Sequence, residues 1–333
     1  MDPIAVFIFV LGCLIGSFLN VCIVRMPREQ SVIFPGSHCG QCKKPVLWYD
    51  NIPIISWLLL KGQCRHCNAK FSIRYLFVEL LTGLAFVGFY QYYGLTPLLL
   101  PYLFMAGCFI VATFVDFAER IIPDEISIGG MFWGIGFSLL IPQMHPVTTG
   151  DVQFSAFLAG LIVLICLALI AVYPFFCKHL MEGQEPSEDR SVRLLVLGSL
   201  GLVIAINALI VHVPAAIVPH LLSLSAALSG YIIGGGLIYA MGLFGDIVFK
   251  KESMGGGDVK LMALVGAFLG WKLAILAFFI APFFGAVFGI IEKIRTKDNT
   301  MAYGPFLVLG TLVSLFYGDA IIQWILRGGI YGN

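Results

Sequence analysis

Four cysteines in the segment 26–75 stand in two pairs with the spacing of a metal site. Cys39-Gly-Gln-Cys42 and Cys64-Arg-His-Cys67 are separated by 21 residues. Two such knuckles can place four thiolates around one ion, and soft thiolate ligands select zinc over magnesium or calcium. The spacing therefore predicts a structural zinc site with Cys39, Cys42, Cys64 and Cys67 as its ligands.

Two disulfides or four unligated thiols are the alternatives for these cysteines, and His38 and His66 are spare nitrogen ligands beside the knuckles. A reducing cytoplasmic location disfavours disulfides. The remaining five cysteines show no ligand spacing, and we expect them to be small apolar side chains in or at the ends of helices. They are Cys13, Cys22, Cys108, Cys166 and Cys177.

Two aspartates lie at the ends of apolar runs, where an ionisable side chain is costly and marks a functional site. Asp116 ends the run that starts at Cys108, and Asp258 follows Met254-Gly-Gly-Gly257. If the two carboxylates face each other, their repulsion raises one pKa and leaves one acid and one base to activate a water. This is aspartyl-protease chemistry. We expect Asp258, at a helix start, to be the base and Asp116, at a helix end, to be its protonated partner.

Each aspartate has a plainer interpretation as a helix cap or a loop residue, and Asp258 can cap the helix that follows it. Asp124, after Pro123, is expected to cap a helix, and Asp246, late in an apolar run, is the best spare carboxylate. The other acidic residues near these positions are Glu79, Glu119 and Glu125.

The chain that positions these side chains has the composition of a membrane protein. Its 333 residues are 59% hydrophobic and only 12% charged, and the mean hydropathy is +0.94. A soluble domain carries about 25% charged residues, so that class is excluded, and the aromatic content excludes disorder. The net charge of +1 gives no reason to expect a nucleic-acid partner. We predict an all-α polytopic membrane protein with about ten transmembrane helices and a small cytoplasmic zinc ribbon.

Ten apolar segments are candidates for crossing a bilayer. The first lacks a basic n-region and a cleavage site, so we expect it to be an uncleaved helix. The ten segments are 3–24, 76–93, 98–116, 125–141, 154–177, 194–213, 220–249, 258–271, 273–291 and 303–326.

Basic residues fall almost entirely on one side of these spans. The segments that follow spans one, three, five, seven and nine, together with Lys260 at the start of the eighth span, hold 18 of the 20 lysines and arginines, and only Lys272 and Arg327 fall on the other side. Positive residues are concentrated in cytoplasmic loops, so the first side is cytoplasmic and both termini face outward. Asp116 and Asp258 are then expected at the same, cytoplasmic membrane edge.

The apolar run Asn51-Ile-Pro-Ile-Ile-Ser-Trp-Leu-Leu-Leu60 lies between the two cysteine pairs. It is too short to span a membrane. It either packs the ribbon against the membrane surface as an interfacial segment or forms the small core of the ribbon itself. The sequence favours neither alternative.

Five motifs, taken together, resemble the type IV prepilin peptidases, in the family's order along the chain. Residues Gly16–Pro27 resemble its N-terminal signature, and the two knuckles with Asn51–Pro53, Ser72–Tyr75 and Glu79 resemble its cytoplasmic domain. Asp116–Asp124 is similar to its first aspartate motif, Met254–Leu261 to its Gly-x-Gly-Asp motif, and Tyr303–Phe306 to a C-terminal motif.

The resemblance implies a bifunctional enzyme of the bacterial inner membrane, multi-pass, with its active site at the cytoplasmic face. Its catalytic residues map onto Asp116 and Asp258. Its substrates would be type IV prepilins and type II secretion pseudopilins, whose leader is cut after a glycine. The new N-terminal residue would then be methylated with S-adenosylmethionine by the cysteine-containing region. The residues that bind this methyl donor, and the oligomeric state, are not predicted.

The chain departs from the family pattern at Gly40 and Leu76, which stand where prolines are frequent, and at Gln63, which stands where a basic residue is common. A longer separation between the aspartates predicts an inserted helix pair. The expected parts are 1–25, the first transmembrane helix; 26–75, the zinc ribbon and methyltransferase region; 76–141, helices with Asp116; 142–228, the inserted pair; and 229–333, helices with Asp258.

The inserted pair carries the acidic residues Glu182, Glu185, Glu188 and Asp189. They form a solvated loop or attract a basic leader, and the first interpretation is the more usual one. Three other functions stay open from the sequence. They are a peptidase without methylation, a transporter that uses the aspartates as an ion site, and a non-enzymatic assembly scaffold.

Overall fold

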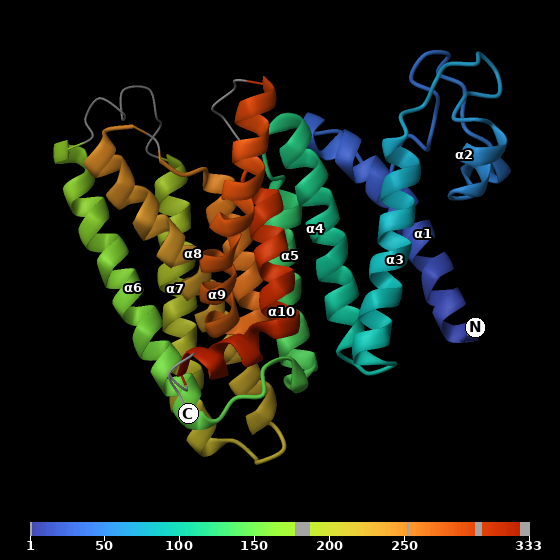
Figure 1. Cartoon of the computed structure of the whole chain (residues 1–333). Coiled ribbons are helices and arrows are strands. Elements are labelled where there is room, and N and C mark those ends of the chain that lie inside the picture. Colours follow the sequence, from blue (N-terminus) through green and yellow to red (C-terminus); the bar gives the residue numbers. More distant parts are fainter. Residues whose placement is uncertain (1, 177–186, 252, 297–301, 327–333) are drawn as a thin grey trace. The chain divides into compact units, whose positions relative to one another are not determined.

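The structure is a computed structural model of the chain and describes residues 2–176, 187–251, 253–296 and 302–326 (Figure 1). In these residues the regular structure is helical, and extended backbone pairs only in two isolated bridges, His38–Pro45 and Gln63–Lys70. The predicted all-α class is confirmed.

Ten α-helices follow one another along the described chain, and short 3₁₀ turns lie between some of them. Their bounds are α1 Pro3–Arg25, α2 Ile55–Leu59, α3 Arg74–Tyr93, α4 Leu99–Glu119, α5 Asp124–Leu140, α6 Thr149–Phe176, α7 Ser187–Leu209, α8 Val218–Phe249, α9 Gly256–Thr296 and α10 Gly304–Leu326.

Within the described residues, six helical segments are long and apolar enough to cross a bilayer, which confirms a multi-pass membrane protein. They are Pro3–Arg28, Leu99–Glu119, Thr149–Tyr173, Val218–Phe249, Gly256–Ile290 and Gly304–Leu326. The predicted spans 258–271 and 273–291 are both parts of α9, whose helical backbone breaks at Gly270 (φ 75°, ψ 173°). Glycine adopts this positive φ without steric cost. The total of about ten crossings stays a prediction.

The chain divides into two compact units, and the first is Met1–Ile126. Within it, α1 and α3 pack through small residues. A Cβ atom on Gly12 would lie 2.8 Å from the Gly83 Cα atom, and one on Gly16 would lie 2.9 Å from the Glu79 Cα atom. Close backbone approach of this kind is how helices associate in lipid, where apolar burial gives no driving force between them.

The second unit, Ser127–Asn333, is built around α8, which packs against α6, α7 and α9, while α10 packs against α9. Glycines again allow the approach. A Cβ atom on Gly266 would overlap the Gly230 carbonyl, and one on Gly310 would lie 2.5 Å from the Ala277 carbonyl oxygen. The first part of α9, which begins beside Asp258, is therefore held directly against the backbone of α8.

His145 closes the helix break at Gly270. Its side chain is buried, and its Nε2 atom lies 3.2 Å from the Ala267 carbonyl oxygen. Burial disfavours the charged imidazolium and lowers the pKa of His145 to about 4. A neutral ring with the proton on Nε2 donates to this carbonyl and fills the space at the break.

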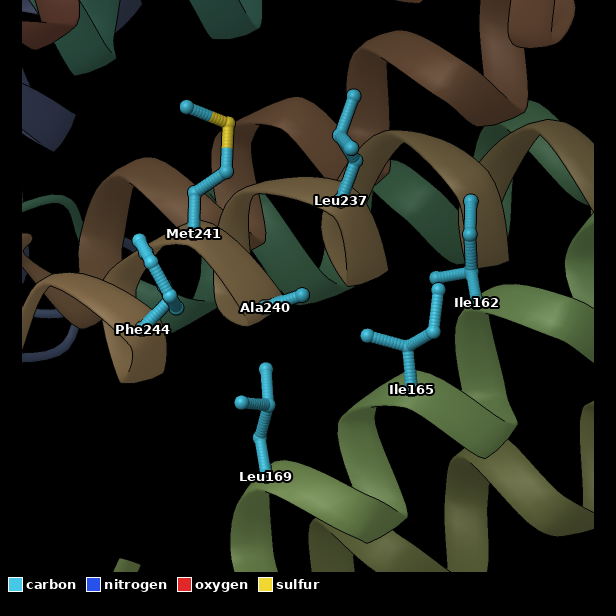
Figure 2. Close-up of a pocket in the computed structure, with 7 residues that line it drawn as sticks. All are labelled: Ile162, Ile165, Leu169, Leu237, Ala240, Met241 and Phe244. Carbon is cyan, nitrogen blue, oxygen red and sulfur yellow. The ribbon is translucent and has the colours of Figure 1, made fainter. Parts of the chain in front are cut away.

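An apolar pocket of about 310 Å³ lies between α6 and α8 (Figure 2). Both helices line it: Ile162, Ile165 and Leu169 belong to α6, and Leu237, Ala240, Met241 and Phe244 belong to α8.

Candidate functional site

The two cysteine knuckles fold as copies of each other, 25 residues apart. In the first, the Cys39 amide donates to the Lys44 carbonyl and the Lys43 amide donates to the Cys39 carbonyl, both at 2.9 Å. The second repeats these bonds from Cys64 to Ala69 and from Asn68 to Cys64, at 2.8 and 2.9 Å. Lys43 and Asn68 both have a positive φ, which turns each loop back on its first cysteine.

The four thiols converge as the sequence predicts. The Sγ atoms of Cys39, Cys42, Cys64 and Cys67 all lie within 4.8 Å of one another. The Cys39–Cys67 pair is 3.7 Å apart and the Cys42–Cys64 pair is 4.0 Å apart. Four sulfurs about 2.3 Å from a tetrahedral zinc are separated by roughly 3.8 Å, so the group has the size of such a site.

Backbone amides prepare one of these thiols for metal binding. The amides of Cys42 and Gln41 donate to the Cys39 sulfur and lower the pKa of Cys39 to about 6. The Ala69 amide favours the Cys67 thiolate, but partial burial and the neighbouring cysteines raise the pKa of Cys67 to about 11. A cation among the sulfurs would favour the thiolate form of Cys67 as well as that of Cys39, because metal ligation stabilises the deprotonated thiol. Neither predicted spare ligand, His38 nor His66, joins the group that the described residues form.

Polar contacts fasten this cysteine module, residues 26–73, to α3, and fasten α3 to α1. The buried Glu79 carboxylate of α3 accepts the Ile54 amide at 2.8 Å. The Asn20 side chain of α1 donates to the Tyr75 carbonyl at 3.1 Å. Within the module, Arg65 binds both oxygens of Asp50 at 2.8 and 2.6 Å, and this pairing lowers the pKa of Asp50.

Asp116 occupies the last turn of α4. The helix ends at Glu119, where Arg120 adopts a left-handed conformation and its amide donates to the Asp116 carbonyl at 3.0 Å. The Asp116 side chain is only 6% exposed, and among the described side chains Glu79 is the other buried carboxylate. A carboxylate buried at the end of an apolar helix is costly, and residues of this kind often mark functional positions in membrane proteins.

Asp258 lies in the first turn of α9, which begins at Gly256 rather than at the predicted residue 258. Its amide donates to the Gly255 carbonyl at 3.1 Å, and its Oδ2 atom would lie 3.5 Å from a Cβ atom on Gly255. The carboxylate therefore rests against bare glycine backbone. It sits inside the helix start, where the dipole favours an anion, instead of in the capping position.

Asp246 and Ser253 hold the loop that leads to these glycines. The Asp246 Oδ1 atom accepts the Ser253 amide at 2.7 Å and the Ser253 hydroxyl at 2.9 Å. The same hydroxyl lies 2.9 Å from the Gly242 carbonyl oxygen. These contacts, the Asp246–Ser253 clasp, fold the loop back onto the last turns of α8. These contacts join the loop before the glycines to the end of α8 and so help to position the start of α9.

Tyr303 is the residue of the C-terminal motif whose pKa responds to the charge of Asp258. Its carbonyl accepts the amides of Phe306 and Leu307 at 3.0 and 3.2 Å and so begins α10. Burial, and secondly the negative charge of Asp258, raise the pKa of the Tyr303 hydroxyl to about 12. The phenol stays protonated beside the carboxylate and is able to donate a hydrogen bond.

Several sequence expectations remain as they were. Asp116 belongs to the first unit and Asp258 to the second, so their meeting stays a prediction. Glu182, Glu185 and Cys177 lie outside the described residues, as do the side chains of Glu188 and Asp189. The sequence marks Asp246 as a spare carboxylate but does not predict the Asp246–Ser253 clasp. Nothing in the sequence identifies Ser253 as its partner except the position of Ser253 shortly before the glycines.

Two family models match the chain. Residues 10–93 match the Bacterial Peptidase A24 N-terminal domain, and residues 192–290 match the Type IV leader peptidase family. The four cysteines lie in the first match and Asp258 lies in the second, whereas Asp116 lies between the two. No solved structure matches the chain.

Similar proteins extend over most of the chain. A "Prepilin leader peptidase/N-methyltransferase" of Myxococcus xanthus is 30% identical over 88% of this chain and 64% of its own length, so the chain spans just under two thirds of that relative. A protein of Aeromonas salmonicida with the same name is 26% identical over 96% of this chain and 92% of its own length. The "Type 4 prepilin-like proteins leader peptide-processing enzyme" of Escherichia coli is 27% identical over 92% of this chain and 91% of its own length.

Together the two matches and these relatives confirm the resemblance that the motifs predicted. The chain belongs to the type IV leader peptidase family.

Proposed function

We propose that this protein is a bifunctional membrane enzyme that removes the leader of type IV prepilins and pseudopilins and then N-methylates the new terminal residue. One observation carries the proposal. Proteins named for both activities are similar to 96% of the chain, and the chain keeps a buried Asp116 and an Asp258 packed on glycine at helix ends. Both activities belong to the relatives by name and to this chain by inference.

The peptidase half would use Asp116 and Asp258 as a coupled pair. Asp258 takes a proton from a water while the water oxygen bonds to the carbon of the scissile carbonyl, and Asp116 gives its proton to the carbonyl oxygen. As the C–N bond breaks, Asp258 gives the proton it took from water to the departing amine, and a hydroxyl of the tetrahedral intermediate returns a proton to Asp116, which restores both side chains. The first-turn position of Asp258 favours its ionised form, and the end position of Asp116 favours the protonated one.

Glycine backbone supports the substrate in this mechanism. Gly255 and Gly256 leave space around the Asp258 carboxylate, since a Cβ atom on Gly256 would meet nothing within 4 Å. An extended leader segment can approach the carboxylate there more closely than side chains would allow. The Tyr303 hydroxyl stays protonated beside Asp258 and would help to hold the carboxylate in place.

The cysteine group would hold a structural zinc ion. Thiolates are the ligands that zinc prefers, and the sulfur separations suit a tetrahedron. Four protein ligands close the coordination sphere, so the ion would brace the two knuckles without taking part in hydrolysis. The module 26–75 would carry the methyltransferase activity, with S-adenosylmethionine supplying the methyl group.

The location of the proposed site follows from charge. Cytoplasmic loops are rich in lysine and arginine, and 18 of the 20 basic residues fall on one side of the predicted spans. The same side holds Asp116, Asp258 and the cysteine module. We place the enzyme in the bacterial inner membrane with its active site at the cytoplasmic face.

Mass spectrometry of the product tests both activities together. The purified protein in proteoliposomes is incubated with a prepilin, with and without S-adenosylmethionine. The proposal expects loss of the leader in both samples and the added mass of one methyl group only where the donor is present. An intact substrate would reject the peptidase, and a cleaved product without a methyl group in both samples would leave a peptidase alone.

A further inference from the structure

Helix α2 of the cysteine module turns its apolar side chains away from the protein. Ile55, Leu58 and Leu59 are 55%, 57% and 78% exposed, while Ser56 is the buried residue of this helix. A segment that formed the core of a ribbon would bury these side chains. The structure therefore argues against the small-core alternative for residues 51–60 and leaves an apolar surface to be covered.

The depth of α2 is fixed by its hydrogen bond to α3. Ile54, directly before α2, donates its amide to Glu79, which lies five residues, or about 7 Å, beyond the start of α3. Glu79 in turn packs against Gly16 of α1, nine residues or about 13 Å before that helix ends at Arg25. Figure 1 shows α2 beside the upper turns of α3. The helix therefore lies beside the apolar length of α1 and not above its end.

The surface around this depth is also apolar. Phe18 on α1 and Phe77 on α3 are 51% and 54% exposed, on two helices that pack against each other in the first unit. In a protein that crosses the bilayer, these side chains face lipid. Ile55, Leu58 and Leu59 of α2 add to the exposed apolar side chains of this unit. Trp48 is 80% exposed in the same module, and tryptophan is enriched at the level of the headgroups.

The positive charge of the cysteine module also favours contact with a lipid surface. Residues 26–73 contain six lysines and arginines but only two acidic residues, Glu29 and Asp50. A short apolar helix accompanied by basic side chains is the composition of an interfacial membrane segment, and anionic headgroups attract it.

We propose that α2 is embedded in the interfacial layer of the cytoplasmic leaflet, with Ile55, Leu58 and Leu59 among the upper acyl chains. Glu79 sets the depth of this contact through Ile54. The lipid surface then holds the cysteine module at the membrane edge, where a newly cut N-terminus would emerge. The inference depends on the membrane-spanning character of α1 and is independent of the proposed catalysis.

Photo-crosslinking in a bilayer tests this contact. A benzophenone amino acid replaces Leu59 in the full chain, which is reconstituted into vesicles of phosphatidylethanolamine and phosphatidylglycerol and irradiated. Phe18 is the lipid-facing control, and the exposed Lys43 in the first knuckle is the aqueous control. We expect phospholipid adducts at position 59 within about twofold of position 18 and about tenfold above position 43.

A lipid-adduct yield no higher than at position 43, both at position 59 and at position 58, would overturn the proposal, as would adducts that join position 59 to a second copy of the chain. Because a bulky probe at Leu59 can disturb α2, the same measurement is made with the probe at Leu58, which is also more than half exposed. Lipid adducts at either position, with none at Lys43, support the interfacial placement.

Discussion

Single hydrogen bonds decide how firmly Asp258 is placed. The Asp246–Ser253 clasp joins the end of α8 to the loop before the glycines through three contacts of 2.7 to 2.9 Å. None of these groups meets the proposed scissile bond, so Asp246 is a positioning residue. Charge-assisted hydrogen bonds contribute about 1.5–3 kcal/mol each when both partners are ordered.

We expect Asp246→Ala to lower kcat for prepilin cleavage by about tenfold and to leave KM within about twofold, because misplacement of a catalytic group affects the transition state more than binding. Asp246→Asn keeps one acceptor oxygen and should retain more activity. Asp319→Ala, at an exposed carboxylate of α10, is the matched control. A rise in KM with unchanged kcat would show that the clasp contacts substrate instead.

The Asp50–Arg65 pair offers a second prediction at this scale. The guanidinium binds both carboxylate oxygens, while the Asp50 and Arg65 side chains are 8% and 49% exposed. Because the Arg65 side chain is half exposed and solvent screens the pair, a double-mutant cycle of Asp50→Asn and Arg65→Gln should give only a small favourable coupling free energy in unfolding of the module. Additive single effects would mean that the pair contributes nothing.

At the scale of helices, the contact between α8 and α9 carries Asp258 into place. Gly230 and Gly266 allow the two backbones to touch, and even a Cβ atom at either position would overlap the other helix. We expect Gly266→Ala to destabilise the protein by about 1–3 kcal/mol, since overpacking must push the helices apart.

Thermal unfolding in detergent micelles measures this effect. Gly160→Ala on α6 is the matched control, because a Cβ atom there would meet nothing within 4 Å and alanine favours a helix interior. Equal melting temperatures for the two variants would contradict the role given to the glycine contact.

Helices were also the part of the fold most open to prediction from sequence. Apolar runs define α1, α4 and α10 to within a few residues, since a membrane helix is long and uniformly apolar. The break at Gly270 was anticipated as a boundary between two spans, although the helical residues on its two sides form one element. The exposure of α2 could not be predicted, because a short apolar run has the same composition in a core and at an interface.

For the whole molecule, we expect mutations in the cysteine module and in the membrane helices to impair different activities. The four thiols close on one another within 26–73, and Asp116 and Asp258 lie on other elements. Knuckle spacing was enough to predict the thiol group, because its ligands are local in sequence. The aspartates are 142 positions apart along the chain, so only their membrane side could be inferred.

We therefore expect Cys39→Ser to release zinc and lower methylation by more than tenfold, while cleavage falls by less than about threefold. Metal content is measured by mass spectrometry and the two activities on one prepilin sample. Cys108→Ala, at a buried cysteine of α4, controls for loss of any cysteine. Methylation that persists without bound metal would contradict the structural role of zinc.

The central claim is that Asp116 and Asp258 act together on one water. Its most direct measurement is prepilin cleavage by Asp116→Asn and Asp258→Asn in proteoliposomes, beside Asp124→Asn at the start of α5. Each of the first two variants should lose more than about a thousandfold in kcat/KM, the double variant should lose no more than either, and Asp124→Asn should stay near wild type, because residues that act as a unit are not additive. Cleavage near the wild-type rate by either Asp116→Asn or Asp258→Asn would contradict the account.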